Sequence, residues 1–183
     1  MRRTLDRLIS WMGLLLAVVL VVAGGLLWWA NSFIGDQVSE QLSMQNITMP
    51  AEDQLETKAQ KDALAQYAGE PMTTGDQAKA YSDHYILEHM NASSGGRTYS
   101  EVSGEFMQLS NDPNADPEKV AEVGQLRQTL FMGSTLRGLL LNAYAFGTIG
   151  KIAGIASIAA FLAGAVLLLL SLLGMRHAKA LEG

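Results

Sequence analysis

The uncharged stretch Ile152–Leu173, IAGIASIAAFLAGAVLLLLSLL, decides the fold class of this chain. An earlier stretch, Leu8–Ile34, is also uncharged and almost entirely apolar. A helix needs about 20 apolar residues to cross the ~30 Å hydrocarbon core of a bilayer. Both stretches therefore predict transmembrane helices. The first is longer than the roughly 7–15 apolar residues of a cleavable signal peptide, so we expect a retained anchor.

Basic residues at both ends of the chain predict the orientation of the two spans. Arg2, Arg3 and Arg7 precede the first span, and Arg176 and Lys179 follow the second. Because basic flanks stay in the cytoplasm, we expect both termini inside the cell. The protein would then be a multi-pass protein of the cell (plasma) membrane, with the lipid bilayer as its first partner. The expected segments are a cytoplasmic tail 1–8, transmembrane helix 1 at 9–34, an extracytoplasmic domain 35–147, transmembrane helix 2 at 148–174, and a cytoplasmic tail 175–183.

The central region has the composition of a water-soluble, acidic domain. Residues 36–147 contain 16 acidic and 7 basic side chains. A nucleic-acid-binding surface is basic, so we expect no nucleic-acid partner. The chain has no cysteine, which excludes disulfides and thiolate metal sites.

Helical signals dominate the central region, and no run alternates as a strand does. Thr98 with Glu101 is typical of a capping box, and Asp116 before Pro117 is typical of a helix start. The fold class predicted is an all-α membrane protein, with two transmembrane helices and an all-helical extracytoplasmic domain. We expect its helices over about 51–68, from Thr73 or Thr74 to Met90, from Thr98 to Leu109, and from Pro117 onward.

The stretch Thr135–Lys151 is apolar but carries Arg137, which is costly at the middle of a bilayer. We therefore expect one rod from about Ser134 to Met175 that enters the bilayer near Lys151. An entry as early as Leu139 is the alternative. The expected anchors at the membrane interface are Trp11, Trp28, Trp29 and Lys151.

Two sets of residues predict helix packing. An apolar stripe should pack on the domain helices, with Val102, Phe106 and Leu109 as contacts, or on a partner. A set of small residues in the second span allows close helix contact, either between the two spans or with another protein. The stripe consists of Leu136, Leu139, Leu140, Ala143, Tyr144 and Gly147, and the small set includes Gly150, Gly154, Ala160 and Gly164.

The stretch YSDHYILEHM, residues 81–90, holds the candidate metal ligands His84, Glu88 and His89. Inverted zincins use H-x-x-E-H, and the spacing here is one residue longer. A transition-metal site also needs further ligands, which nothing in the sequence singles out. We therefore expect a plain helix here, with no metal, no cofactor and no catalytic residues.

Three stretches carry a resemblance: YAGEPMTTGDQAKAYSDHYILEHM (67–90), GGRTYSEVS (95–103) and TLFMGSTLRGLLLNAYAFGTIGKIAG (129–154). They are similar to a group of small, uncharacterised actinobacterial membrane proteins with two spans. Members sometimes carry an automatic label of aromatic ring-opening dioxygenase, which the residues here do not support. The resemblance implies a source and a two-span topology, and it assigns no catalytic residue.

Three functional hypotheses follow. The first is a non-enzymatic accessory or scaffold subunit of a larger membrane complex, associating with other membrane subunits or with itself. A respiratory complex is one candidate, by analogy with small subunits of actinobacterial respiratory assemblies. The second is an extracytoplasmic sensor or ligand-binding module, with Tyr67, Tyr81, Tyr85 and Tyr99 lining a pocket. The third and most remote is a metalloenzyme built on the histidines of residues 81–90.

Overall fold

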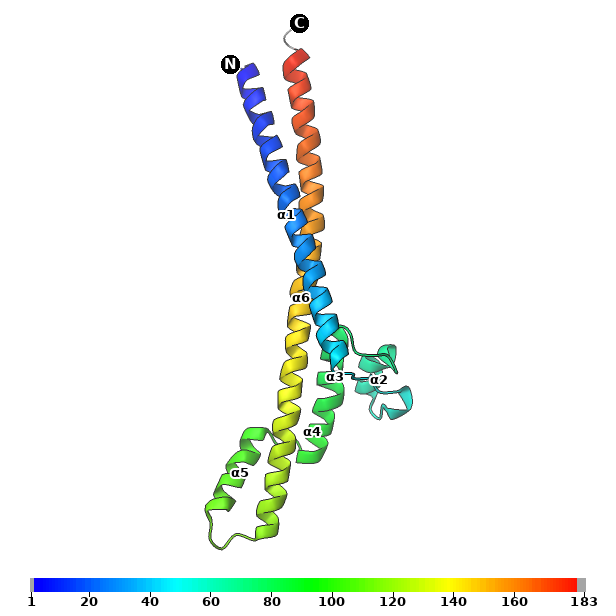
Figure 1. Cartoon of the computed structure of the whole chain (residues 1–183), viewed down its shortest axis with the longest axis vertical. Coiled ribbons are helices and arrows are strands. Elements are labelled where there is room, and N and C mark those ends of the chain that lie inside the picture. Colours follow the sequence, from blue (N-terminus) through cyan, green and yellow to red (C-terminus); the bar gives the residue numbers. More distant parts are fainter. Residues whose placement is uncertain (1, 181–183) are drawn as a thin grey trace. The chain divides into compact units, whose positions relative to one another are not determined.

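The computed structural model describes residues 2–180, and the side chains of residues 4–179. Every regular element in this part of the chain is helical (Figure 1). The predicted all-helical class is therefore confirmed for the described residues. The elements are α1 (Arg2–Met44), η1 (Glu52–Gln54), α2 (Lys58–Leu64), η2 (Ala65–Tyr67), α3 (Gly75–Tyr81), η3 (Ser82–Ile86), α4 (Leu87–Ser94), α5 (Tyr99–Asn111) and α6 (Pro117–Ala180).

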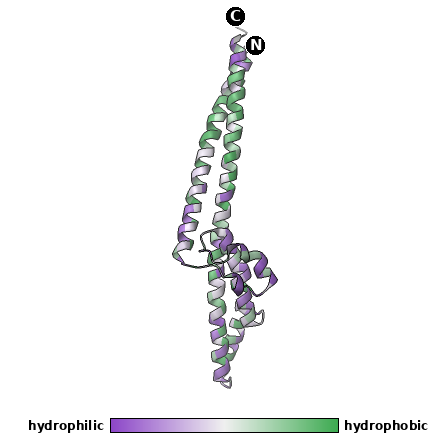
Figure 2. Ribbon diagram, turned by 90° about the vertical axis from the view of Figure 1, so that its right-hand side faces the viewer, coloured by the Kyte–Doolittle hydropathy of each residue, from purple (hydrophilic) through white to green (hydrophobic). Residues whose placement is uncertain are grey.

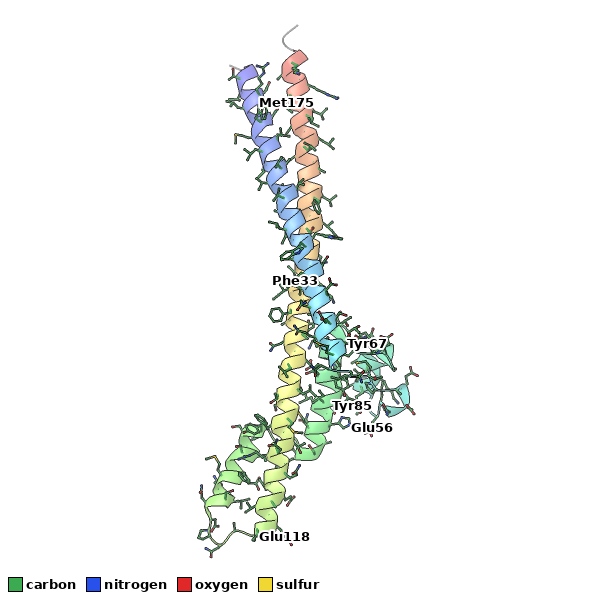
Figure 3. All side chains as sticks on the ribbon, viewed as in Figure 1. Phe33, Glu56, Tyr67, Tyr85, Glu118 and Met175 are labelled. Carbon is green, nitrogen blue, oxygen red and sulfur yellow. The ribbon has the colours of Figure 1, made fainter. Side chains whose placement is uncertain are left out.

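The chain divides into two compact units. The first unit combines residues 1–36 with residues 148–183, and the second is Gln37–Gly147. The helices α1 and α6 are both long and apolar enough to cross a membrane. Figure 2 shows that hydrophobic residues dominate their parts in the first unit. Most large apolar side chains there are exposed, among them Phe33 (Figure 3).

Within the first unit, the small residues of α6 face α1. A Cβ added at Gly154 would lie 2.7 Å from Asn31 Oδ1, and one at Gly150 would lie 3.1 Å from Ile34 Cγ2. Gly164 is buried against Val21. Ala160 is half-buried on the same helix. The small residues were expected to pack either between the two spans or on another protein. In the structure they pack against α1.

A hydrogen bond accompanies this close packing. The buried Ser157 Oγ donates to the Gly24 carbonyl oxygen at 2.7 Å. A serine hydroxyl in an apolar environment is costly unless it is bonded. The bond therefore both satisfies Ser157 and holds α6 at one register against α1.

In the second unit, α5 and α6 form an antiparallel hairpin around Val102, Val123 and Leu130. Phe106 and Leu109 pack on the same cluster. The expectation that Val102, Phe106 and Leu109 contact the stripe 136–147 is wrong. The turn 112–116 is short, so the thirteen residues of α5 reach only the first turns of α6.

The segment between α1 and α3 contributes further buried side chains. Met49, Leu55, Leu64 and Met72 are all nearly fully buried. The predicted continuous helix 51–68 is wrong, because the backbone is extended at Leu55 and Thr57. Thr57 restarts the helix in a capping box with Gln60, whose Oε1 accepts from the amides of Glu56 and Thr57 at 2.8 and 3.0 Å.

The other helix ends follow local signals. The capping box predicted at Thr98 and Glu101 is confirmed. Pro117 is the first residue of α6, and the Glu118 amide donates to Asp116 Oδ1 at 2.9 Å. The helical run that was expected to end near Met90 continues to Ser94, because Gly95 supplies the left-handed conformation that ends it, with φ +64°.

Candidate functional site

The site lies where η3 meets α6 in the second unit. The turn η3 is π-helical: the Leu87 amide donates to the Ser82 carbonyl oxygen, five residues back. Such single turns widen a helix locally and are common at functional positions. The segment 81–90 is therefore helical, as expected, but it carries an extra residue in its central turn.

Arg137 of α6 inserts its guanidinium at this widened turn. Its Nε donates to the Ser82 carbonyl oxygen at 3.0 Å, and its Nη2 donates to Asp83 Oδ1 at 3.1 Å. The side chains of Arg137 and Asp83 are each 24% exposed. Hydrogen bonds to charged groups are stronger than neutral ones, and the planar guanidinium can serve two acceptors at once. Arg137 thus joins α6 to both the backbone and the side chain of η3.

Lys79 of α3 completes the charge cluster. Its Nζ donates to Asp83 Oδ2 at 2.5 Å and lies 5.4 Å from the centroid of the Tyr144 ring. A cation near the face of an aromatic ring is attracted by its quadrupole. Asp83 therefore stands between two cations, and the cluster of three charged groups has a net positive charge.

The surroundings shift the pKa values of these groups. Burial of the Asp83 carboxyl raises its pKa, but hydrogen bonds from Lys79 and Arg137 outweigh this and hold the pKa below its ordinary value. The hydrogen bond to Asp83 raises the pKa of Lys79. Burial raises the pKa of Tyr81, which lies two residues before Asp83 in the sequence. All three groups keep their ordinary charge at neutral pH.

Ser82 is unusual within this cluster. Its side chain is fully buried, and its Oγ has no hydrogen-bond partner among the described residues. An unpaired buried hydroxyl costs about 1–3 kcal/mol. The cluster therefore contains a polar atom that the rest of this part of the chain leaves unsatisfied.

Close backbone packing lies one turn from the cluster. A Cβ added at Gly75, the first residue of α3, would lie 2.9 Å from Tyr144 Cα and 3.0 Å from the Ala143 carbonyl oxygen. Gly147 faces the same residue. The small side chains let the start of α3 touch the backbone of α6, which places Lys79 beside Tyr144.

The predicted stripe is only partly covered in the second unit. Leu140 is 2% exposed, Leu136 and Tyr144 are half-buried, and Leu139 is 62% exposed. At Ala143, Tyr144 and Gly147 the stripe contacts Gly75 of α3, and not the predicted α5. Leu139 is the most exposed leucine of the stripe.

The candidate metal ligands do not form a ligand set. His89 Nδ1 lies 2.7 Å from the Tyr85 carbonyl oxygen, and the two rings are in contact. Across residues 2–180, no three His, Asp or Glu side chains are grouped so that they could hold a metal ion. His84 and Glu88 are half-buried on the same helical run.

The four tyrosines expected at a sensor pocket lie in different places. Tyr81 and Tyr85 stack on each other at 4.9 Å between ring centroids, on the helical run labelled at Tyr85 in Figure 3. Tyr99 packs against Phe131 of α6, and Tyr67 belongs to η2. Of the four, the structure brings Tyr81 and Tyr85 into contact, and a pocket shared with Tyr67 and Tyr99 stays a prediction.

The predicted interface anchors are all exposed in the first unit: Trp11, Trp28, Trp29 and Lys151. Trp29 stacks on Phe33 at 5.4 Å. Their place at the membrane surface stays a prediction.

No protein-family model, curated protein or solved structure matches this chain. The site must therefore be interpreted from its own chemistry.

The cluster is a structural clamp in which Arg137 of α6 holds η3. It also contains one buried polar atom, Ser82 Oγ, that has no hydrogen-bond partner among the described residues. Sequence reasoning placed Arg137 outside the bilayer but did not find its partner. A signal was present, since an arginine in an apolar segment requires acceptors. Asp83 lies 54 positions away in sequence, among several other carboxylates, so no local pattern could select it.

Proposed function

We propose that the chain is a two-span membrane protein, with both termini in the cytoplasm, that holds a helical domain outside it. In this proposal it acts without catalysis, as an accessory or scaffold subunit of a larger membrane complex. A respiratory complex is one candidate for that assembly. The observation that carries the proposal is the first unit, whose polar and small residues face inward while large apolar side chains face outward.

This arrangement is the reverse of a water-soluble helix pair. Gly24, Ser157 and Gly164 are buried between the helices, whereas Leu15, Val18 and other large apolar residues are exposed. Each large apolar side chain left in water forgoes about 1.5–3 kcal/mol of transfer free energy. A lipid environment removes this cost. Close packing through small residues is also typical of helices that associate in lipid.

The second unit supports a docking role. Its polar cluster of Lys79, Asp83 and Arg137 is used to join α3 and η3 to α6. These bonds fix α3 and η3 against α6, which suits a scaffold, while apolar side chains such as Leu139 stay exposed on the unit.

Single cysteines test the topology, because the chain has none of its own. Ser110→Cys on α5 should react with a membrane-impermeant maleimide on intact cells. Lys179→Cys should react only after the membrane is opened. The reverse labelling, or release of the protein by alkaline carbonate, would refute the proposed topology.

Gentle detergent extraction tests the subunit role. The intact chain should migrate in a complex of fixed composition, larger than its own mass. A monodisperse monomer without any associated chain would contradict a scaffold role even if the topology were right.

A further inference from the structure

One face of α6 in the second unit is largely exposed, although Tyr99 of α5 packs against Phe131 at one end of it. Its residues recur at three- and four-residue spacing, on the side of the helix opposite Leu130, Arg137 and Tyr144. We call this face the α6 seam. It consists of Phe131, Met132, Thr135, Gly138, Leu139, Asn142, Ala145 and Phe146, all of which are exposed.

The seam is apolar to a degree that is unusual for an exposed helix face. Met132, Leu139 and Phe146 are 59%, 62% and 58% exposed, and they follow one another at seven-residue intervals. A contiguous apolar patch of this kind marks an interaction site. Seven-residue spacing is the repeat of two helices that wind around each other.

Gly138 lies within the seam and presents no side chain there. A Cβ at Gly138 would meet nothing within 4 Å, whereas Gly124, Gly133 and Gly147 of the same helix each face a neighbour. Glycine inside a helix is unfavourable relative to alanine, and nothing in the described chain offsets this at Gly138. A missing side chain at an interface lets two helix backbones approach closely.

The charge of the seam suits a second copy of itself. Arg137 is the only charged residue between Gln128 and Gly150, and it turns away to Asp83. Two seams therefore bring no like charges together. The Asn142 amide offers both donors and an acceptor, so it can pair with its own twin. An asparagine that becomes buried in a coiled-coil interface specifies register and oligomer state.

We propose that the α6 seam binds the α6 seam of a second copy of this chain, in parallel, with each residue facing its twin. The inference rests on the proposed membrane topology, because copies inserted in one bilayer share one orientation. A parallel pair about an axis along the membrane normal is then the arrangement that closes. The partner is thus identified as a second copy, and its contact surface as residues 131–146.

Disulfide crosslinking of the full chain in native membranes tests the proposal. Met132→Cys and Leu139→Cys should each give a crosslinked dimer of the chain under mild oxidation. Met107→Cys is the matched control, because Met107 lies on α5 and is 59% exposed, as Met132 is. An equal dimer fraction in the Met107 variant, or none in the seam variants, would overturn the proposal. A crosslink from the seam to a different protein would overturn it as well.

Gly138→Leu provides a second test, at a position where an added Cβ meets nothing within 4 Å in the described chain. Its matched control is Gly104→Leu, since a Cβ at Gly104 also meets nothing within 4 Å. The Gly138 variant should lose the dimer while its helical circular dichroism is kept, and the Gly104 variant should retain the dimer. A dimer that survives Gly138→Leu would refute the seam. Release by alkaline carbonate would instead refute the membrane topology, whatever the crosslinking shows.

Discussion

Gly75→Ala should loosen the contact between α3 and α6. The added Cβ would lie 2.9 Å from Tyr144 Cα and 3.0 Å from the Ala143 carbonyl oxygen. Both atoms belong to the backbone of α6, so no side-chain rotation can relieve the clash. The start of α3 must move away from α6, and Lys79 and Asp83 move with it.

The size of the effect follows from the cost of overpacking. One methyl group forced into a packed position costs typically about 1–3 kcal/mol. Since each 1.4 kcal/mol is tenfold in an equilibrium constant, local opening should rise about 5- to 150-fold. Hydrogen–deuterium exchange of the full chain in detergent, followed on the amides of α3 and η3, measures this opening directly.

Gly104→Ala is the control for this experiment. Gly104 lies on α5, and a Cβ there meets nothing within 4 Å. Alanine should stabilise that helix by about 0.5–1 kcal/mol relative to glycine, so exchange in α5 should slow. If Gly75→Ala left exchange of α3 unchanged or slowed it, the close approach of α3 to α6 would be refuted.

Three further predictions concern the cluster at η3. Arg137→Gln should destabilise the second unit by about 1.5–3 kcal/mol, because the hydrogen bonds to Ser82 and Asp83 are charge-assisted. Urea titration of the full chain in detergent measures this loss, and an unchanged midpoint would contradict the clamp. Ser82→Ala should stabilise the unit by about 1 kcal/mol, since the buried Oγ has no partner in the described chain, and destabilisation would show that the hydroxyl is used. Because the pKa of Asp83 is lowered, its contribution to stability is present above about pH 4 and is lost as the pH falls through the folded pKa. Because the pKa of Lys79 is raised, its contribution to stability is present below about pH 10 and is lost as the pH rises above it. Urea titrations across pH should show the free energy of unfolding falling at both the acidic and the basic end, and Asp83→Asn should remove its fall at the acidic end.

Local patterns were sufficient for the helical class and for several helix ends. The two apolar runs are long enough that only a helix satisfies their backbone in lipid. The capping box at Thr98 and Glu101 involves residues three apart, so the local sequence alone reveals it. The same box at Thr57 and Gln60 was missed, because the good helix formers around it favoured one continuous helix.

The candidate site was only half visible in the sequence. An arginine at position 137 in an apolar stretch demands acceptors, and this much could be argued from residue type. Its actual acceptors, the Ser82 carbonyl and the Asp83 carboxylate, depend on the π-helical turn η3. No pattern in YSDHYILEHM marks that turn, because an α-helix satisfies the same residues equally well.

By itself, the sequence determined which segments are apolar enough to span a membrane, where most helices begin, and which small residues permit close contact. Those properties depend on residue type and on neighbours within one or two turns. Only the tertiary structure decided that Gly154 faces Asn31, that α5 packs near Val123, and that Leu139 stays exposed while Leu140 is buried. These outcomes depend on the length of the turns and on which helix face meets which neighbour. Such pairings join residues far apart in the chain, and an amphipathic pattern does not name its partner.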